Sequence, residues 1–261
     1  MRDRAWLRWM AAGLLLYTSF MIVLLPASWI GWAAVKANIP ATLFHPVGTV
    51  WRGSARATLH TPGHTRIASG EISWRINPLY LAIGRLGFDL EFLSDQIRIS
   101  TNGKIGRSAL DINKVQARLP VSTISLFYPL LANASLTGTV LLDSTALSMT
   151  NNSIVGAARI NLESVSSSWL GRGNQGSYNI NLDANGKVLH YSLTTSSGAI
   201  QIQGAGSWEL FSTGKLDFDG RITAENGASP PSVLQHIGKT NPDGTRQVQW
   251  STRAPFLPVS P

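Results

Sequence analysis

The stretch Glu71-Ile72-Ser73-Trp74-Arg75-Ile76 decides the fold class, because its apolar and polar side chains alternate strictly. Successive side chains of an extended strand point to opposite faces, so Ile72, Trp74 and Ile76 share one face. The same period of two recurs as far as residue 250, and its other apolar members are Ala55, Ala57, Leu59, Phe88, Leu90, Phe92, Ile97, Ile99, Ala158, Ile160, Leu162, Tyr178, Ile180, Leu182, Ile200, Ile202, Leu216, Phe218, Val248 and Trp250. One apolar face and one polar face are typical of an antiparallel sheet that covers a single core.

Turn signals separate the alternating runs, as expected for strands joined by hairpins. They are Thr61-Pro62-Gly63, Thr101-Asn102-Gly103, Asn151-Asn152, Ala184-Asn185-Gly186 and Asn241-Pro242-Asp243-Gly244. Helical periodicity after residue 40 is confined to Val121–Leu131 and Ser232–Ile237, which suffice for one or two turns each. Because an α/β enzyme core needs long amphipathic helices, the pattern predicts a mainly β domain over residues 45–250. We expect an antiparallel sheet, curved or sandwich-like, with one or two short helices.

A short sequence repeat suggests an internal duplication. Gly48-Thr49-Val50 recurs as Gly138-Thr139-Val140, and each copy leads into a run of strands of similar length. Similarity at a fixed period is typical of repeated structural units. Gly-Thr-Val is also a common way to enter a strand, so duplication near residues 48 and 138 and chance similarity both stay open.

The N-terminal region carries an apolar segment that predicts a membrane anchor. No residue from Trp9 to Val35 is charged, and about 20 helical residues cross the ~30 Å hydrocarbon layer of a bilayer. We therefore predict a transmembrane helix over residues 9–32. The bases before this helix are Arg2, Arg4 and Arg8. Only Lys36 stands directly after it, so the charge bias places residues 1–8 in the cytoplasm and the β-domain outside it.

A cleaved secretory signal is the alternative interpretation of the same segment. Pro26-Ala27-Ser28 would provide the small-residue cleavage site that follows the apolar stretch of such a signal. Against cleavage, Trp29 would directly follow the cut, and the apolar character continues to Val35. Both interpretations place the β-domain outside the cytoplasm. At the other end, residues 251–261 are rich in Pro and Ser and are predicted to form a flexible tail.

Composition limits the classes of partner and chemistry. The chain of 261 residues has no cysteine, which excludes disulfides, thiolate catalysis and thiolate metal sites. Charged residues make up only 14%, against roughly 25% in typical soluble domains, and the net charge is +8. No cluster of Lys or Arg contains interleaved aromatic residues, which disfavours nucleic acid as a partner. Single bases beside an apolar segment favour contact with membrane lipid through the N-terminal helix.

Known catalytic and metal-binding patterns are missing from the sequence. The histidines have no metal-ligand spacing, and they are His45, His60, His64, His190 and His236. Gly171–Gly176 spells G-x-G-x-x-G, but it runs into the strand expected at Ser177–Leu182 rather than into a helix, so a hairpin loop is the better interpretation. Asp217 and Asp219 share one sheet face and could chelate a cation or transfer protons, although a solvated outer face is the simpler interpretation. We therefore predict no enzyme activity and no catalytic, cofactor-binding or metal-binding residues.

Two short segments are more specific than the overall pattern. Residues 47–55 read Val-Gly-Thr-Val-Trp-Arg-Gly-Ser-Ala, and residues 72–81 read Ile-Ser-Trp-Arg-Ile-Asn-Pro-Leu-Tyr-Leu. Together with the N-terminal span and Leu25-Pro26-Ala27 at its exit, they resemble protein N of the type II secretion system. The positions that match the family's motifs are Gly48, Thr49, Trp51, Gly53, Trp74, Arg75 and Pro78.

The residue types in these motifs predict structural roles. We expect Trp51 to fill the core of the sheet, with Trp74 across from it. Gly53 should permit a bulge or a close approach of another part of the chain. Arg75 should point to the opposite face of the sheet, and Pro78 should end its strand because proline lacks the N–H that a β-ladder needs.

The resemblance implies an accessory component of the secretion system's inner-membrane platform. Such a protein would support export of folded periplasmic proteins across the outer membrane of a Gram-negative cell through protein–protein contacts. Its partners would be other platform proteins and the periplasmic domains of the outer-membrane secretin. It would be a single-pass inner-membrane protein with a periplasmic β-domain, and the family provides no catalytic residues. The alternative function is a membrane-anchored periplasmic lipid-handling protein whose curved sheet forms a groove for acyl chains.

Overall fold

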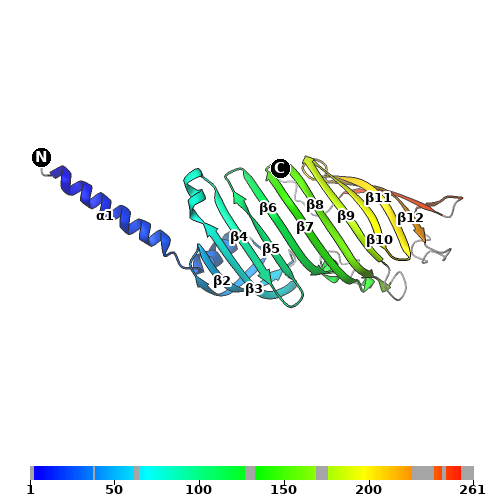
Figure 1. The fold of residues 1–261 in the computed structure, drawn as a ribbon, viewed down its shortest axis with the longest axis horizontal. Helices are drawn as coiled ribbons and strands as arrows, with labels where there is room; N and C mark the ends of the chain where they lie inside the picture. The colour runs from blue at the N-terminus through cyan, green and yellow to red at the C-terminus, as the bar shows by residue number, and fades with distance from the viewer. Residues whose placement is uncertain are drawn as a thin grey trace.

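The sheet expected from the alternating pattern is present in the computed structural model of the protein. The structure describes residues 3–37, 39–61, 65–126, 133–168, 176–224, 238–242 and 245–253. The described helices are the α-helices α1 (Asp3–Val23) and α2 (Ser28–Lys36) and the short 3₁₀ helices η1 (Pro78–Ile83) and η2 (Val121–Leu126). Figure 1 shows α1 extending away from one end of a long, twisted sheet.

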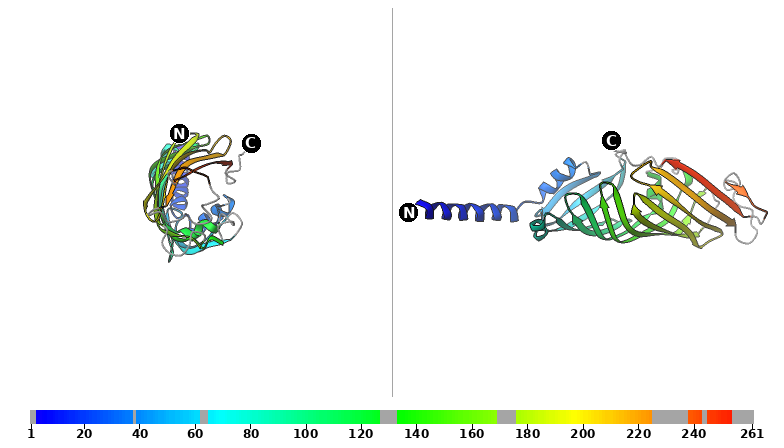
Figure 2. Two further views of the ribbon diagram at one scale, coloured as in Figure 1. Left: turned by 90° about the vertical axis from the view of Figure 1, so that its right-hand side faces the viewer. Right: turned by 90° about the horizontal axis from the view of Figure 1, so that it is seen from above.

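The described strands form one antiparallel sheet. They are β1 (Ala41–Gly48), β2 (Arg52–His60), β3 (Arg66–Asn77), β4 (Leu86–Leu93), β5 (Arg98–Ile105), β6 (Ala109–Pro120), β7 (Thr137–Thr150), β8 (Ser153–Ser166), β9 (Gly176–Gly186), β10 (Val188–Ser197), β11 (Ile200–Glu209), β12 (Lys215–Ala224), β13 (Lys239–Thr240) and β14 (Arg246–Arg253). They lie in chain order from β1 to β12, followed by β14 and β13. Figure 2 shows from the end that the sheet curves into an open trough. A curved antiparallel sheet is therefore confirmed, and the described residues do not form the two layers of a sandwich.

Cross-strand register separates the side chains into two faces of opposite chemistry. One row runs from β2 to β14 and contains only aliphatic, aromatic and glycine residues: Ala55, Ile72, Phe92, Ile99, Ala117, Leu142, Ile160, Ile180, Leu193, Gly204, Gly220 and Val248. A neighbouring row on the other face is polar except for one alanine: Ser54, Ser73, Glu91, Ser100, Gln116, Asp143, Arg159, Asn181, Ser192, Ala205, Asp219 and Gln249. We call these two sides the apolar face and the polar face.

The apolar face lines the hollow side of the trough. In Figure 2, α2 lies on the hollow side, and Ala27 and Ile30 at the start of α2 pack against Ala55 and Trp74 of the apolar face. In the adjacent cluster, Ala57 is completely buried. Curvature brings neighbouring apolar side chains together and removes them from water, which favours this face on the inside.

The uncharged N-terminal segment forms two helices rather than one continuous span. α1 ends at Val23 and α2 begins at Ser28, with Pro26 between them. Proline has no N–H to donate and disfavours helical conformation in the residue before it, which accounts for the break. In the described part of the chain, no helix is both long enough and apolar enough to cross a membrane. The predicted single transmembrane helix is therefore not confirmed.

The ends of the sheet differ from the predicted limits of the β-domain at residues 45–250. β1 already begins at Ala41. β14 continues to Arg253, so the first residues of the predicted tail belong to a strand. Residues 254–261 lie outside the described part of the chain.

The short helices agree in part with the sequence pattern. The helix predicted over Val121–Leu131 is η2 as far as Leu126, whereas Ser232–Ile237 lies outside the described residues. η1 was not predicted. Its start is stabilised by Asn77, whose side-chain oxygen accepts a hydrogen bond of 3.0 Å from the Leu79 N–H.

The two Gly-Thr-Val segments have one backbone feature in common. Gly48 and Gly138 both have positive φ, +97° and +120°, in a region that favours glycine. Gly48 ends β1, whereas Gly138 lies inside β7. A shared backbone conformation does not decide between duplication and chance, so the duplication stays a prediction.

Candidate interaction site at the helix–sheet junction

The two family-motif segments meet at the end of the sheet nearest α1. Thr49 and Trp51 lie in the connection from β1 to β2, and Gly53 stands directly opposite Trp74 of β3. The Trp74 side chain is only 4% exposed. Its indole Nε1 donates to the carbonyl oxygens of Thr49, at 3.2 Å, and of Val50, at 3.1 Å. Trp74 therefore fixes the connection to the sheet, and it lies across from Gly53 rather than from Trp51.

Two glycines and a threonine shape the connection between β1 and β2. Gly48 turns the chain with φ of +97°. The Thr49 N–H then donates to the Arg52 carbonyl at 2.9 Å, and the Arg52 N–H donates to Thr49 Oγ1 at 3.2 Å. A Cβ on Gly53 would lie 2.4 Å from a carbonyl oxygen of β1 and 2.6 Å from a ring carbon of Trp74. The predicted close approach at Gly53 is thus present.

The segment that leaves α1 pairs with this connection. The Val50 N–H donates to the Leu25 carbonyl at 2.9 Å, and the Ala27 N–H donates to the Gly48 carbonyl at 3.1 Å. An isolated antiparallel bridge joins Pro26 to Thr49. These bonds satisfy backbone groups on both segments and hold the exit of α1 beside the edge of the sheet.

Trp51 does not fill the core of the sheet, contrary to prediction. Its side chain is partly exposed, and its indole Nε1 donates to the Ile22 carbonyl in the last turn of α1 at 2.8 Å. Carbonyl groups in the last turn of a helix lack the full set of intrahelical partners, and side-chain donors often satisfy them. Trp51 stands in a connection rather than in a strand, so the period of two does not determine its face.

Arg75 stands in β3 between Trp74 and Ile76, beside the junction, whereas Pro78 lies just beyond the end of this strand. Arg75 is exposed on the polar face, as predicted, and its register partners are Arg52 and Asp89. Pro78 follows Asn77, the last residue of β3, and begins η1, so the predicted end of the strand is confirmed.

Three residues outside the seven motif positions also take part in the junction. Ile22, Leu25 and Ala27 contribute the backbone groups that contact the connection, and Ala27 is 2% exposed. The sequence Leu25-Pro26-Ala27 stands out at the end of the apolar segment. Nothing local in it indicates pairing with residues 48–50, because that contact exists only after the sheet has formed.

Apolar side chains remain exposed around the junction. On α2 these are Trp29, Trp32 and Val35, with exposed fractions of 53%, 60% and 72%, and on β1 Val47 is 67% exposed. The Trp29 and Trp32 rings meet edge to face with centroids 6.1 Å apart. Exposed tryptophan beside Lys36 is typical of a surface that contacts a membrane interface or an apolar protein surface. These side chains leave an apolar surface exposed beside the junction.

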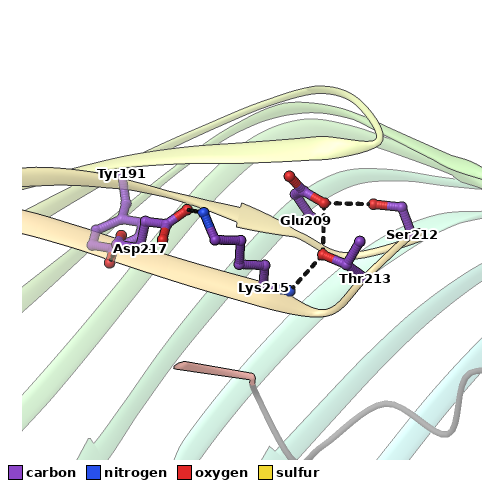
Figure 3. A network of polar contacts seen from close by, with 6 residues as sticks. All are labelled: Tyr191, Glu209, Ser212, Thr213, Lys215 and Asp217. Atoms are coloured by element: carbon purple, nitrogen blue, oxygen red, sulfur yellow. Dashed lines mark hydrogen bonds and ion pairs between the residues drawn. The ribbon is translucent and has the colours of Figure 1, made fainter. Parts of the chain in front are cut away.

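A cluster of polar side chains, separate from the junction, lies at the turn between β11 and β12 (Figure 3). Glu209 Oε2 accepts hydrogen bonds from Ser212 Oγ at 2.9 Å and from Thr213 Oγ1 at 2.7 Å. Beside it, Lys215 Nζ lies 2.8 Å from a carboxylate oxygen of Asp217. The cluster closes this hairpin with charge-assisted contacts on exposed side chains.

These contacts shift the pKa values of the groups involved. The hydrogen bonds from Thr213 and Ser212 lower the pKa of Glu209. The hydrogen bond between Lys215 and Asp217 lowers the pKa of Asp217 and raises that of Lys215. Burial raises the pKa of the Tyr191 hydroxyl, which donates to the Asp217 backbone carbonyl at 2.6 Å, and the charge of Asp217 adds to the rise. All these shifts favour the protonation states that hold the hairpin together.

The carboxylates Asp217 and Asp219 lie two residues apart in β12, on the polar face. Asp217 is engaged by Lys215. Among the described residues, no group of three or more His, Asp or Glu side chains is arranged to hold a metal ion. The pair belongs to the polar face, in agreement with the simpler interpretation.

The G-x-G-x-x-G segment leads into a strand. Its last glycine, Gly176, is the first residue of β9. A dinucleotide site would need a helix at this point, so the predicted strand context is confirmed. Residues 169–175 lie outside the described part of the chain, and the predicted hairpin loop falls on them.

The chain matches the family model for type II secretion system (T2SS), protein N over residues 41–249. The match begins at the first residue of β1 and includes all the motif positions at the junction and in β3. Comparisons with curated proteins and with solved structures found no match. Because the matched stretch covers well over half of the chain and nearly all of the sheet, the chain belongs to the type II secretion system protein N family.

Proposed function

We propose that this protein is an accessory component of the inner-membrane platform of the type II secretion system, and that it supports export of folded periplasmic proteins across the outer membrane. Family membership indicates involvement in type II secretion. The observation that carries the finer proposal is the junction, where family-motif residues hold the exit of α1 against the sheet. A sheet fixed in this way suits positioning of partners by protein–protein contact rather than catalysis.

The proposal places α1 from Trp9 onward in the inner membrane, with residues 1–8 in the cytoplasm and the sheet in the periplasm. Apolar side chains on α1 are 52–79% exposed, and they include Trp9, Met10, Leu14, Leu15, Leu16, Tyr17, Phe20, Met21, Ile22 and Val23. A helix that is apolar on all sides is normally buried in protein or in lipid. Trp29 and Trp32 just beyond it suit the membrane–water interface.

The polar face is the proposed contact surface for partners. It lies on the outer side of the trough and carries both signs of charge, which favours specific side-chain pairing over non-specific association. Near the membrane end it presents Arg56 and Arg75, both exposed. We propose that platform proteins contact this end, and that the periplasmic domains of the outer-membrane secretin contact the far end.

Site-specific crosslinking tests this arrangement. A photoreactive residue is placed at Arg56 or at Arg75, with Arg221 as the matched control, because Arg221 is also exposed on the polar face but lies in β12 at the far end of the sheet. In cells with an active secretion system, irradiation should capture inner-membrane platform proteins at the first two positions and none at Arg221. Deletion of the protein should lower the amount of secreted protein in the medium and raise it in the periplasm. The proposal fails if no platform protein is captured and deletion leaves secretion unchanged.

A further inference from the structure

The apolar face continues far beyond the part that packs against α2. A second register row on this face runs through Gly53, Trp74, Leu90, Thr101, Val115, Ser144, Ala158, Leu182, Tyr191, Gly206, Phe218 and Trp250. With strands about 4.8 Å apart, the fourteen-stranded sheet is about 60 Å long. In the described part of the chain, no second sheet lies over this surface.

Several hydroxyl groups on the apolar face donate hydrogen bonds to backbone carbonyl groups of the protein itself. Ser144 Oγ donates to the Ala157 carbonyl at 2.8 Å. The Tyr191 hydroxyl donates to the Asp217 carbonyl, and Thr195 Oγ1 donates to the Ile202 carbonyl at 3.2 Å. These groups are already paired, so the face offers few polar partners to a ligand.

This chemistry favours a hydrocarbon ligand over an extended peptide. A peptide laid along the trough would bring N–H and carbonyl groups that lose water and find no partners, which is unfavourable. An acyl chain has no such groups and gains from every apolar contact. The sheet is also long and open along one side, whereas a compact ligand needs a closed pocket.

The apolar face is continuous with the membrane end of the protein. It begins at Ala55 and Trp74, where α2 packs on it. Around this end the chain is basic, since no acidic residue occurs between Arg4 and Glu71. Basic side chains attract anionic lipid headgroups. A lipid that leaves the bilayer beside α1 would therefore meet positive charge first and then the apolar trough.

One buried donor on the apolar face lacks an acceptor. The indole Nε1 of Trp208 is buried and has no hydrogen-bond partner among the described residues. Its register neighbours, Leu189 and Leu216, place Trp208 on the apolar face. An ester carbonyl is an acceptor that a glycerophospholipid would bring with its acyl chains.

We propose that the apolar face binds the acyl chains of membrane phospholipids along the trough, with entry at the end where α2 packs. This activity goes beyond the role in secretion, and it rests on the proposed placement of α1 in the membrane. The polar face would stay in water, so the two faces would serve different partners.

Photolabelling of the unmodified full-length protein tests the proposal. The protein is reconstituted in vesicles of phosphatidylethanolamine and phosphatidylglycerol that contain a trace of phosphatidylglycerol with a diazirine in its acyl chain. After irradiation, mass spectrometry locates the labelled residues. Label is expected on α1 and on apolar-face residues such as Ile160 and Ile180, and not on their polar-face neighbours Arg159 and Asn181.

Each pattern of labelling has a definite meaning. Label on α1 alone, or equal label on both faces of the sheet, would overturn the trough proposal. Label on the apolar face without α1 would support the trough and contradict the membrane placement of α1. Absence of label from both α1 and the sheet would overturn both.

Matched variants separate acyl binding from general damage to the sheet. Ile180→Gln puts an amide into the trough and should lower labelling of β8 to β10 several-fold while α1 is labelled as before. Asn179→Gln, on the polar face of the same strand, should leave the labelling unchanged. Ile180→Leu keeps the apolar surface and should keep the label. Equal loss in all three variants would contradict a specific acyl site.

Discussion

At the residue scale, the position of one indole ring explains why two distant motif segments occur together. The Trp74 N–H is shared between the Thr49 and Val50 carbonyls. The ring itself occupies the space beside Gly53, where a Cβ would come within 2.6 Å of it. The glycine in one segment is therefore required by the tryptophan in the other. The sequence places Trp74 on the core face correctly, because strand alternation is local, but the two carbonyl acceptors belong to a loop that alternation does not describe.

Trp74→Phe should destabilise the protein by about 1–3 kcal/mol, since the partly buried Thr49 and Val50 carbonyl groups lose their donor while most of the ring's apolar surface remains. Urea unfolding of the detergent-solubilised chain, followed by circular dichroism, measures the change. Trp29→Phe is the matched control, because Trp29 is 53% exposed, and its effect should stay within about 0.5 kcal/mol. An unchanged unfolding midpoint for Trp74→Phe would mean that these hydrogen bonds do not stabilise the junction.

At the scale of elements, the sequence predicts strands better than connections. β3 illustrates the success: Ile72, Trp74 and Ile76 share the apolar face, and Pro78 ends the strand. Trp51 illustrates the failure, because its indole contacts a carbonyl 29 residues earlier in the chain. A hairpin needs only neighbouring residues to define its register, whereas this contact depends on where the whole N-terminal segment lies. The seven motif positions lie close to one another only in the folded chain, because Gly48 to Gly53 and Trp74 to Pro78 are separated by some twenty residues in sequence.

The hairpin of β11 and β12 should loosen in acid. The pKa values of Glu209 and Asp217 lie below their ordinary values of 4.5 and 3.8. Groups with lowered pKa values stabilise the folded state above their unfolded pKa, and this contribution disappears as the pH falls through the lowered values. Amide hydrogen exchange in β11 and β12, corrected for intrinsic rates, should therefore become faster relative to β4 and β5 between about pH 5 and about pH 3.

Glu209→Gln provides the control for the acid response of this hairpin. The amide can still accept hydrogen bonds from Ser212 and Thr213 but does not titrate, so part of the pH dependence should vanish. Because both carboxylates are exposed, the effect should be modest and should shrink in salt. Equal pH dependence in wild type and variant would exclude Glu209 as its source.

At the scale of the whole molecule, the open trough could not be predicted from alternation alone. A sandwich and a curved single sheet both need one apolar face, and Ile72, Phe92 and Ile160 would alternate identically in either. The difference lies in pairing: each strand from β1 to β11 pairs with the next and β12 pairs with β14, so the described strands form one continuous sheet that does not fold back on itself. That order is a property of all the hairpins together. It leaves a polar outer surface and an apolar inner surface along the entire sheet, which is why one protein can be proposed to hold both a protein partner and a lipid.

The junction should fix the direction in which the sheet leaves α1. Because the chain has no cysteine, spin labels can be placed uniquely, for example through Leu15→Cys on α1 and Ser100→Cys on the polar face of β5. Pulsed electron–electron distance measurements in membranes should give a narrow distribution for this pair. Trp51→Phe removes the hydrogen bond to the Ile22 carbonyl, and this substitution should broaden the distance distribution of the Leu15–Ser100 label pair.

A label pair that lies entirely within the sheet separates motion at the junction from motion of the sheet. Ser73→Cys and Asn181→Cys both lie on the polar row, and their distance distribution should not change with Trp51→Phe. If broadening is confined to the pair that crosses the junction, the indole holds the helix and the sheet in one orientation, as a fixed part of a membrane platform requires. A broad distance distribution for the pair that crosses the junction, with Trp51 intact, would mean that α1 and the sheet move independently. The sheet would then not be held in one orientation relative to α1.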